Sequence, residues 1–169
     1  MSIADSILNR LQKLLVYLVK QDPDGGWGEF VAGCQPVWSR IVAAGHSQGS
    51  GHTAYLGRMF KLDKVLMFSG PQDYLNDLGE PAPWQPSPSA TPSSSFFAFL
   101  SLNDTFNVHH QIANCMVLMG LTKPETQMVK PGKSSTETTK FSSTTSKRTG
   151  LMAQLSSHSL KTFGSIWAR

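Results

Sequence analysis

The sequence has little of what marks a disulfide-stabilised or a membrane-spanning protein. Its 169 residues include only two cysteines, Cys34 and Cys115. Two are too few for a disulfide framework, so we expect two ordinary thiols, with a single bridge between them as the alternative. No apolar run approaches the roughly 18 residues that a membrane-spanning helix needs, and we expect no membrane span. Residues 1–20 also lack the pattern of a signal peptide, because charged residues interrupt the apolar ones and no small-residue cleavage site follows.

Charge is scarce and unevenly spread. Charged side chains make up 15% of the sequence, and the net charge is +4. Residues 1–129 carry eight basic and ten acidic side chains, whereas residues 130–169 carry seven basic and one acidic. The basic character therefore belongs to the C-terminal tail. Such a tail can bind acidic surfaces weakly. Without interleaved aromatic residues or a known motif, we expect no specific nucleic-acid partner.

What the sequence does contain is enough apolar material for one packed domain. The hydrophobic fraction is 40%, which is typical of a globular chain. The composition changes near residue 130, since sixteen of the last forty residues are Ser or Thr. Such a segment buries too little surface to offset its ordering entropy. We therefore expect a domain over 1–129 and a mostly disordered tail over 130–169. Within the tail, we expect 130–149 to be disordered and 151–167 to form a short helix or a weakly docked end.

Hydrophobic periodicity predicts an α/β fold. Short apolar runs predict buried strands, and apolar residues at helical spacing predict helices. A strand, a glycine-rich turn, a helix and a second strand follow one another, which predicts a parallel βαβ unit with a right-handed crossover. The result is a small parallel sheet flanked by helices. The predicted strands are 40–44, 64–68 and 96–100, the predicted helices are 3–20, 52–61 and 106–119, and 70–95 is a long surface loop.

The motif Gly45-His46-Ser47-Gln48-Gly49 lies between the first strand and the following helix. A G-x-S-x-G sequence in that position is typical of a nucleophile turn, in which strained backbone presents the serine hydroxyl above the sheet. Small residues at Gly45 and Gly49 let the strand and the helix approach. The backbone N–H of Gln48, at the helix N-terminus, is then placed to stabilise an oxyanion. The glycine spacing fits no dinucleotide or Walker motif, so we expect no cofactor and no metal.

The stretch from Trp38 to His52, WSRIVAAGHSQGSGH, resembles α/β-hydrolases of a poorly characterised, esterase-like group that is often secreted. The similarity continues through 68–73 and 82–84, and it spans residues 3–129. The resemblance implies a partial α/β-hydrolase fold and a serine–acid–histidine triad in that chain order. It also implies hydrolysis of a small ester or related acyl substrate through an acyl-enzyme, with Ser47 as the nucleophile.

Two aspartates are candidates for the acid and one histidine for the base. Asp104 follows the strand 96–100 and resembles the acid of the family, while Asp73 follows the strand 64–68 and is the alternative. Either aspartate could instead be a turn or helix-cap residue. His158 alone comes late enough in the chain to be the base, because His109 and His110 follow Asp104 too closely.

The resemblance begins at the helix before the serine strand, so the earlier strands of a full hydrolase are absent from this sequence. Those strands carry the loop that supplies the second oxyanion donor. Losing one donor lowers the rate roughly 100- to 1000-fold, so we expect a weak or inactive hydrolase. The alternative is a catalytically dead remnant that acts as a binding or interaction domain. Loss of half the sheet also exposes a strand edge, which favours self-association.

Overall fold

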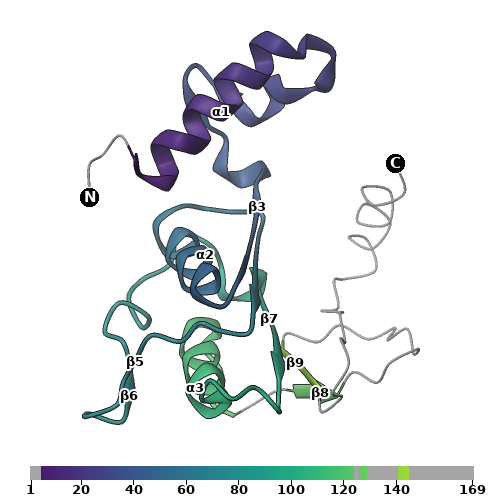
Figure 1. Ribbon diagram of the computed structural model, residues 1–169. Coiled ribbons are helices and arrows are strands. Elements are labelled where there is room, and N and C mark those ends of the chain that lie inside the picture. Colours follow the sequence, from purple (N-terminus) through teal and green to yellow (C-terminus); the bar gives the residue numbers. More distant parts are fainter. Residues whose placement is uncertain (1–4, 124–125, 129–140, 145–169) are drawn as a thin grey trace.

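The computed structural model of the chain describes residues 5–123, 126–128 and 141–144. These residues form an α/β fold, in which the main sheet has five parallel strands in the order β3-β4-β7-β9-β8. Helices α2 and α3 lie together on one face of this sheet, and α1 lies beyond its β3 edge (Figure 1). The predicted α/β class with a small parallel sheet is therefore confirmed. The strands of the main sheet are β3 (Val42–His46), β4 (Lys64–Phe68), β7 (Phe96–Ser101), β8 (Thr126–Met128) and β9 (Phe141–Thr144).

The three predicted strands are all present, and two of them have slightly different bounds. β4 has the predicted range, and β7 is one residue longer than predicted. β3 begins two residues later than predicted because η4 (Trp38–Arg40) is a 3-10 turn, closed by the Ile41 N–H donating to Trp38 O at 3.0 Å. The Trp38 ring stacks on Phe60 at 4.2 Å between centroids, which anchors this turn against the end of α2.

Strands β8 and β9 were not predicted. β9 pairs in parallel with β7 and lies inside the segment 130–149, for which we predicted disorder. At these four residues the prediction was wrong, because the backbone of buried β7 needs a partner on its second side. The remainder of 130–149, together with the predicted end segment 151–167, lies outside the described residues.

Local capping signals set the start of α1 and the end of α3. α1 (Ile7–Gln21) begins where the Ser6 hydroxyl accepts a hydrogen bond from the Asn9 N–H. α2 (Gln48–Met59) begins four residues earlier than predicted, directly after Ser47. α3 (Val108–Met119) begins two residues later than predicted and ends at Gly120, whose φ of 66° is readily adopted by glycine.

Between α1 and η4 the chain is folded into short turns. A small antiparallel hairpin pairs Val31–Ala32 with Gln35–Pro36. The elements in this stretch are η2 (Pro23–Gly25), η3 (Trp27–Phe30), β1 (Val31–Ala32) and β2 (Gln35–Pro36). They contact α1 and form with it a unit outside the main sheet (Figure 1).

The segment 70–95 is more ordered than the surface loop we predicted. It contains the hairpin β5 (Tyr74–Leu75) and β6 (Glu80–Pro81) and the turn η5 (Ser93–Ser95). The buried Thr91 hydroxyl donates to Phe60 O at 2.7 Å and accepts from the Leu62 N–H at 2.8 Å. Polar side chains of this segment therefore pair with the backbone at the end of α2, and this pairing holds the segment against the domain.

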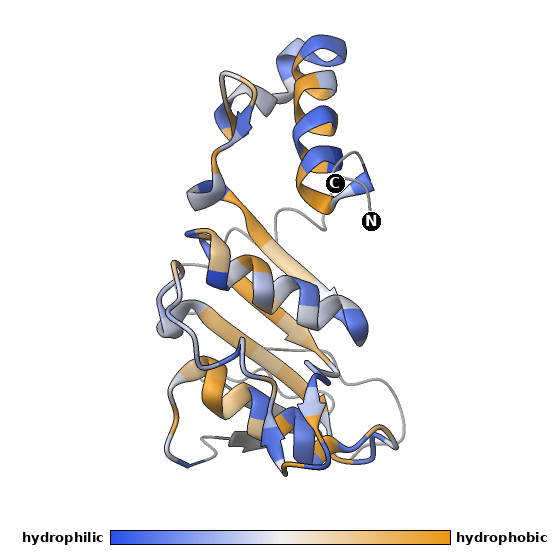
Figure 2. Ribbon diagram, turned by 90° about the vertical axis from the view of Figure 1, so that its left-hand side faces the viewer, coloured by the Kyte–Doolittle hydropathy of each residue, from blue (hydrophilic) through white to orange (hydrophobic). Residues whose placement is uncertain are grey.

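The core lies between the sheet and the helices α2 and α3. Strands β4 and β7 supply half of the buried apolar residues, and in Figure 2 these strands lie behind the two helices. Helix α2 packs closely on β4 and β7 at Gly57. A Cβ at this position would lie 2.7 Å from Val65 Cγ2 and 2.8 Å from Phe96 Cζ. The largest buried apolar side chains of this core are Val65, Met67, Phe96, Leu100, Leu118 and Met119.

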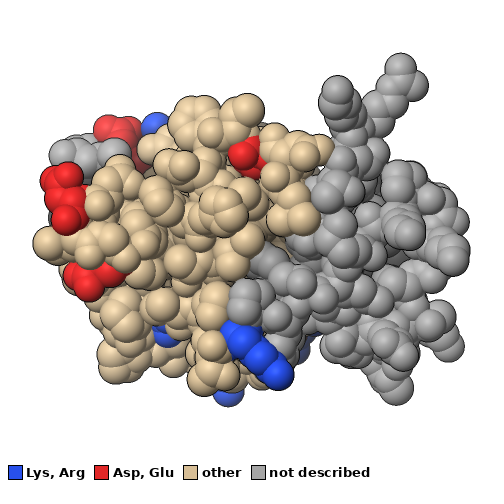
Figure 3. Space-filling model, turned by 90° about the horizontal axis from the view of Figure 1, so that it is seen from below, with Lys and Arg blue, Asp and Glu red and all other residues tan. Residues whose placement is uncertain are grey.

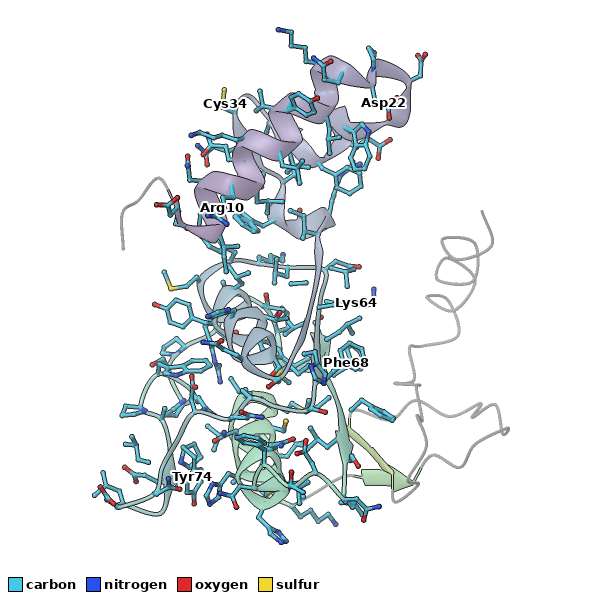
Figure 4. All side chains as sticks on the ribbon, viewed as in Figure 1. Arg10, Asp22, Cys34, Lys64, Phe68 and Tyr74 are labelled. Atoms are coloured by element: carbon cyan, nitrogen blue, oxygen red, sulfur yellow. The ribbon has the colours of Figure 1, made fainter. Side chains whose placement is uncertain are left out.

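The two cysteines are free, as predicted. Cys115 is buried in α3, whereas Cys34 is exposed in the turn between β1 and β2, beside α1 (Figure 4). Burial raises the pKa of the Cys115 thiol. In the described part of the chain, no helix has both the length and the apolar character required to cross a membrane.

Candidate functional site

Ser47 has the backbone conformation of a nucleophile turn. It is the single residue between β3 and α2, and its φ and ψ are 54° and −121°. A residue with a side chain is rarely found there, and holding it costs of order 1–3 kcal/mol. Such strain persists only where the surrounding structure enforces it, and it concentrates at functional sites. The predicted position of Ser47, in the tight turn after the first strand, matches the structure.

Contacts on both sides hold this turn. The Ser47 N–H donates to Phe68 O of β4 at 2.9 Å. The Ser47 carbonyl oxygen accepts hydrogen bonds from the Ser50 N–H and the Ser50 hydroxyl. A Cβ on Gly45 would lie 2.0 Å from Gly49 O, so only glycine fits at position 45. A Cβ on Gly49 itself would meet nothing within 4 Å, so the second glycine of the motif is not required by packing in this structure.

The N-terminus of α2 offers an unpaired hydrogen-bond donor beside Ser47. In the part of the chain that the structure describes, the Gln48 N–H has no acceptor, and the first turn of α2 contains no acidic residue. The positive end of the helix dipole therefore faces the space next to the serine hydroxyl. An oxygen that gains negative charge there would be stabilised by this N–H.

The acid candidate Asp104 is held at the same end of the sheet as Ser47, where the parallel strands have their carboxyl ends. It follows β7, two strands away from β3, which corresponds to about 10 Å at normal strand spacing. Its Oδ1 accepts a hydrogen bond from the Phe106 N–H at 2.9 Å, and its Oδ2 accepts one from Gln111 Nε2 at 3.2 Å. The carboxylate is therefore fixed by two donors, and a side chain between the two strand ends could reach both it and Ser47.

The alternative acid, Asp73, has a different environment. Its side chain is exposed, and its Oδ2 lies 3.7 Å from the position of a Cβ on Gly51, in the first turn of α2. An acidic group beside the first turn of a helix stabilises that helix through its dipole. The Asp73 carbonyl oxygen accepts hydrogen bonds from the Ala82 N–H and from Gln85 Nε2. These contacts favour a structural role for Asp73 and leave Asp104 as the better-oriented carboxylate.

The predicted base, His158, lies outside the described residues. Among the described histidines, none hydrogen bonds to the Ser47 hydroxyl. His46 and His52 are exposed, and His110 stacks on Tyr74 with 3.9 Å between ring centroids. The structure therefore places Ser47, Gln48 and Asp104 at the carboxyl ends of the parallel strands.

A hollow of about 330 Å³ lies next to this turn, between α1, β3 and α2. Its walls are mostly apolar, and Gly49 and His52 of α2 form the part closest in sequence to Ser47. The remaining lining residues are Ile7, Leu11, Trp38, Ile41, Ala43, Ala44, Thr53 and Leu56.

The described part of the chain shows no sign of a metal centre. Within the described ranges, no group of three or more His, Cys, Asp or Glu side chains could hold a metal ion. The face seen from below in Figure 1 carries only scattered charged side chains (Figure 3). No protein family, curated protein or solved structure matches this chain.

Sequence reasoning missed Gln111. This residue is fully buried, and it links α3 to the turn that carries Asp104. A glutamine in a helix gives no signal by itself, since the same residue type is common on solvated helix faces. Only its burial and its two hydrogen bonds distinguish it.

Proposed function

We propose that this protein is a serine hydrolase that cleaves a small ester or related acyl substrate, with Ser47 as the nucleophile. The observation that carries the proposal is the strained backbone of Ser47 between a parallel strand and a helix, with the free Gln48 N–H beside it. This arrangement meets the structural context that gives a G-x-S-x-G motif its chemical meaning.

The proposed reaction proceeds through an acyl-enzyme. Ser47 Oγ attacks the acyl carbon while a histidine imidazole takes its proton, and the Gln48 N–H stabilises the oxyanion. The C–O bond to the leaving alkoxide then breaks, and the imidazolium returns the proton to it. Water then attacks the acyl carbon of the acyl-enzyme while the histidine takes its proton. The bond to Ser47 Oγ breaks, and the imidazolium returns the proton to the serine. We propose His158 as this base and Asp104 as the acid that orients it.

The test is covalent labelling with a fluorophosphonate, which reacts with activated serines. We expect the wild-type chain to be labelled and Ser47→Ala not to be. Loss of the nucleophile of a triad lowers kcat about a million-fold, and His158→Ala should cost nearly as much. Ser39→Ala is the matched control, because Ser39 is exposed in η4, outside the turn. Equal labelling of wild type and Ser47→Ala would show that the motif is only a turn.

Even if Ser47 is labelled, we expect a low kcat for a simple activated ester. In the described part of the chain, the Gln48 N–H is the donor at the site, and we identify no second one. The lack of one oxyanion donor lowers kcat roughly 100- to 1000-fold. Robust hydrolysis that disappears in Ser47→Ala would contradict this expectation and imply a second donor.

A second candidate function, that of an interaction domain, is favoured by the β3 edge. The Ser47 N–H and the Ile41 carbonyl point toward β4. Strand alternation therefore turns the N–H and C=O groups of Val42, Ala44 and His46 outward. None of these six groups has a hydrogen-bond partner among the described residues. The strand also lacks the charged residues and prolines that normally protect a sheet edge.

We propose that this edge pairs with a strand of a second copy, and sedimentation velocity of the full chain tests it. Ala44→Pro removes one outward N–H without touching the bonds to β4, and proline is tolerated on edge strands. We expect dimers in wild type and monomers in Ala44→Pro. Ala43→Pro is the contrasting variant, since its N–H points toward β4 and its loss should lower stability. A wild-type chain that stays monomeric at high concentration would exclude this pairing.

A further inference from the structure

The turn between β7 and α3 presents the Asp104 carboxylate from an exposed loop. The Asp104 N–H donates to Ser101 O at 3.0 Å, and the carboxylate in turn accepts from the Phe106 N–H. Phe106 itself is 70% exposed and Leu102 is also exposed, so apolar packing does little to hold the turn. An aspartate on such a loop would sample several rotamers unless a further contact restrained it.

Gln111 supplies that contact from the buried face of α3. Its side chain is fully buried, and its amide nitrogen donates to Phe106 O at 2.7 Å and to Asp104 Oδ2 at 3.2 Å. Both acceptors are oxygens with no proton to give, so the amide NH₂ must face them. Both amide protons are thus used to tie the turn to the helix.

Among the described residues, the other half of the same amide has no partner. Gln111 Oε1 is buried without a hydrogen bond, an arrangement that typically costs about 1–3 kcal/mol. This cost is opposed by the two hydrogen bonds that the NH₂ group makes to Phe106 O and Asp104 Oδ2. The amide is therefore favoured by what its NH₂ group does for the carboxylate.

We propose that Gln111 is a positioning residue that fixes the Asp104 carboxylate for the histidine of the proposed triad. This inference rests on the proposed hydrolase function and on Asp104 as its acid. Each carboxylate oxygen accepts one hydrogen bond from the protein and keeps a lone pair free for an imidazole N–H. Without the Gln111 amide, the carboxylate would keep its bond from the Phe106 N–H but lose the bond that ties it to α3.

The test compares two buried amides of α3. Gln111→Leu removes the donor to Asp104 at similar volume. Asn114→Leu is the matched control. Asn114 is also fully buried, and its amide oxygen likewise has no partner in the described part of the chain, but its nitrogen donates to Pro71 O at 2.9 Å. With all variants assayed well below their unfolding transitions, we expect Gln111→Leu to slow fluorophosphonate labelling of Ser47 by up to about 100-fold, the effect of misplacing a catalytic group by about 1 Å. Asn114→Leu should label at close to the wild-type rate.

A double-mutant cycle separates positioning from a general loss of structure. If Gln111 acts through Asp104, then Gln111→Leu should slow labelling in the wild-type background and have no further effect in an Asp104→Asn background. Additive effects in the two backgrounds, or equal slowing by Gln111→Leu and Asn114→Leu, would overturn the proposal.

The Gln111→Glu variant adds a pH readout. Its carboxyl group has nearly the shape of the amide, but it can donate to Asp104 only while it is protonated. The ratio of its labelling rate to that of wild type should therefore fall as the pH rises from 5 to 8. A ratio that does not change with pH would contradict the assigned role. If wild type is not labelled at all, the hydrolase proposal fails and this one fails with it, whereas labelling that Gln111→Leu leaves unchanged removes only the role of Gln111.

Discussion

The two glycines of the serine motif should respond differently to alanine, although the sequence pattern treats them alike. A Cβ on Gly45 would lie 2.0 Å from Gly49 O, 2.3 Å from Gly49 C and 2.5 Å from Thr53 Oγ1. Ordinary contacts of a Cβ begin near 3.4 Å. The closest obstacles are backbone atoms, which cannot turn aside as a side chain can. To accommodate Gly45→Ala, strand β3 and helix α2 must therefore separate.

The magnitudes follow from this geometry. Inserting a methyl group into packed structure typically costs about 1–3 kcal/mol, and the backbone clash puts Gly45→Ala at about 3 kcal/mol. Gly49→Ala meets no atom within 4 Å and replaces a helical glycine, which should stabilise the protein by up to about 1 kcal/mol. For a chain of this size, each kcal/mol shifts Tm by roughly 2–4 °C. Gly45→Ala should lower Tm by about 6–12 °C, and Gly49→Ala should raise it by up to about 4 °C.

Thermal unfolding followed by circular dichroism measures both shifts, and fluorophosphonate labelling reports on the turn itself. We expect Gly45→Ala to lose labelling even where it remains folded, because the displaced helix changes the conformation at Ser47. Gly49→Ala should keep both its fold and its reactivity. Equal Tm values for the two variants, or a more damaging effect of Gly49→Ala, would refute the steric argument.

Three further predictions concern the core. Gly57→Ala should destabilise the protein by about 1–3 kcal/mol in denaturant titrations, because its Cβ would press on Val65 and Phe96, yet it should leave Ser47 labelling unchanged at low temperature. Under native conditions a thiol reagent should modify exposed Cys34 at once and buried Cys115 only on unfolding, so rapid modification of both would place Cys115 outside the core. Burial raises the pKa of the Cys115 thiol above its ordinary 9.0. The unfolded chain thus loses this proton at lower pH than the folded one, and stability should fall as pH rises above 9. This loss should be smaller in Cys115→Ser when denaturant midpoints are compared across pH.

Local sequence signals determined much of the fold. Strand 64–68 is a continuous apolar run, which is typical of a strand buried on both faces in a parallel sheet, and the structure has it with the same bounds. The order of strand, glycine turn, helix and strand around Ser47 also followed from periodicity and glycine placement alone. These features depend on neighbours close in the chain, so the sequence contains the information needed to predict them.

Features that depend on distant residues were not predictable in this way. Strand β9 lies in a Ser- and Thr-rich segment and pairs with β7, more than forty residues earlier in the chain. The folded conformation of 70–95 similarly depends on hydrogen bonds from the Thr91 hydroxyl to Phe60 O and from Gln85 Nε2 to Asp73 O. The sequence gives no sign that these groups are close in space. Propensity and periodicity describe a residue's own element, whereas these pairings are chosen by which surfaces meet.

For the site, the sequence determined the tight turn at Ser47 and the two candidate carboxylates, because motif spacing and strand ends are local properties. The tertiary structure alone separated Asp104, held by Phe106 and Gln111, from Asp73, which lies beside the first turn of α2. It alone also showed that Gly45 is required by packing while Gly49 is not. The physical reason is that hydrogen bonds and steric contacts act across a few ångströms of space, and chain separation does not specify those distances.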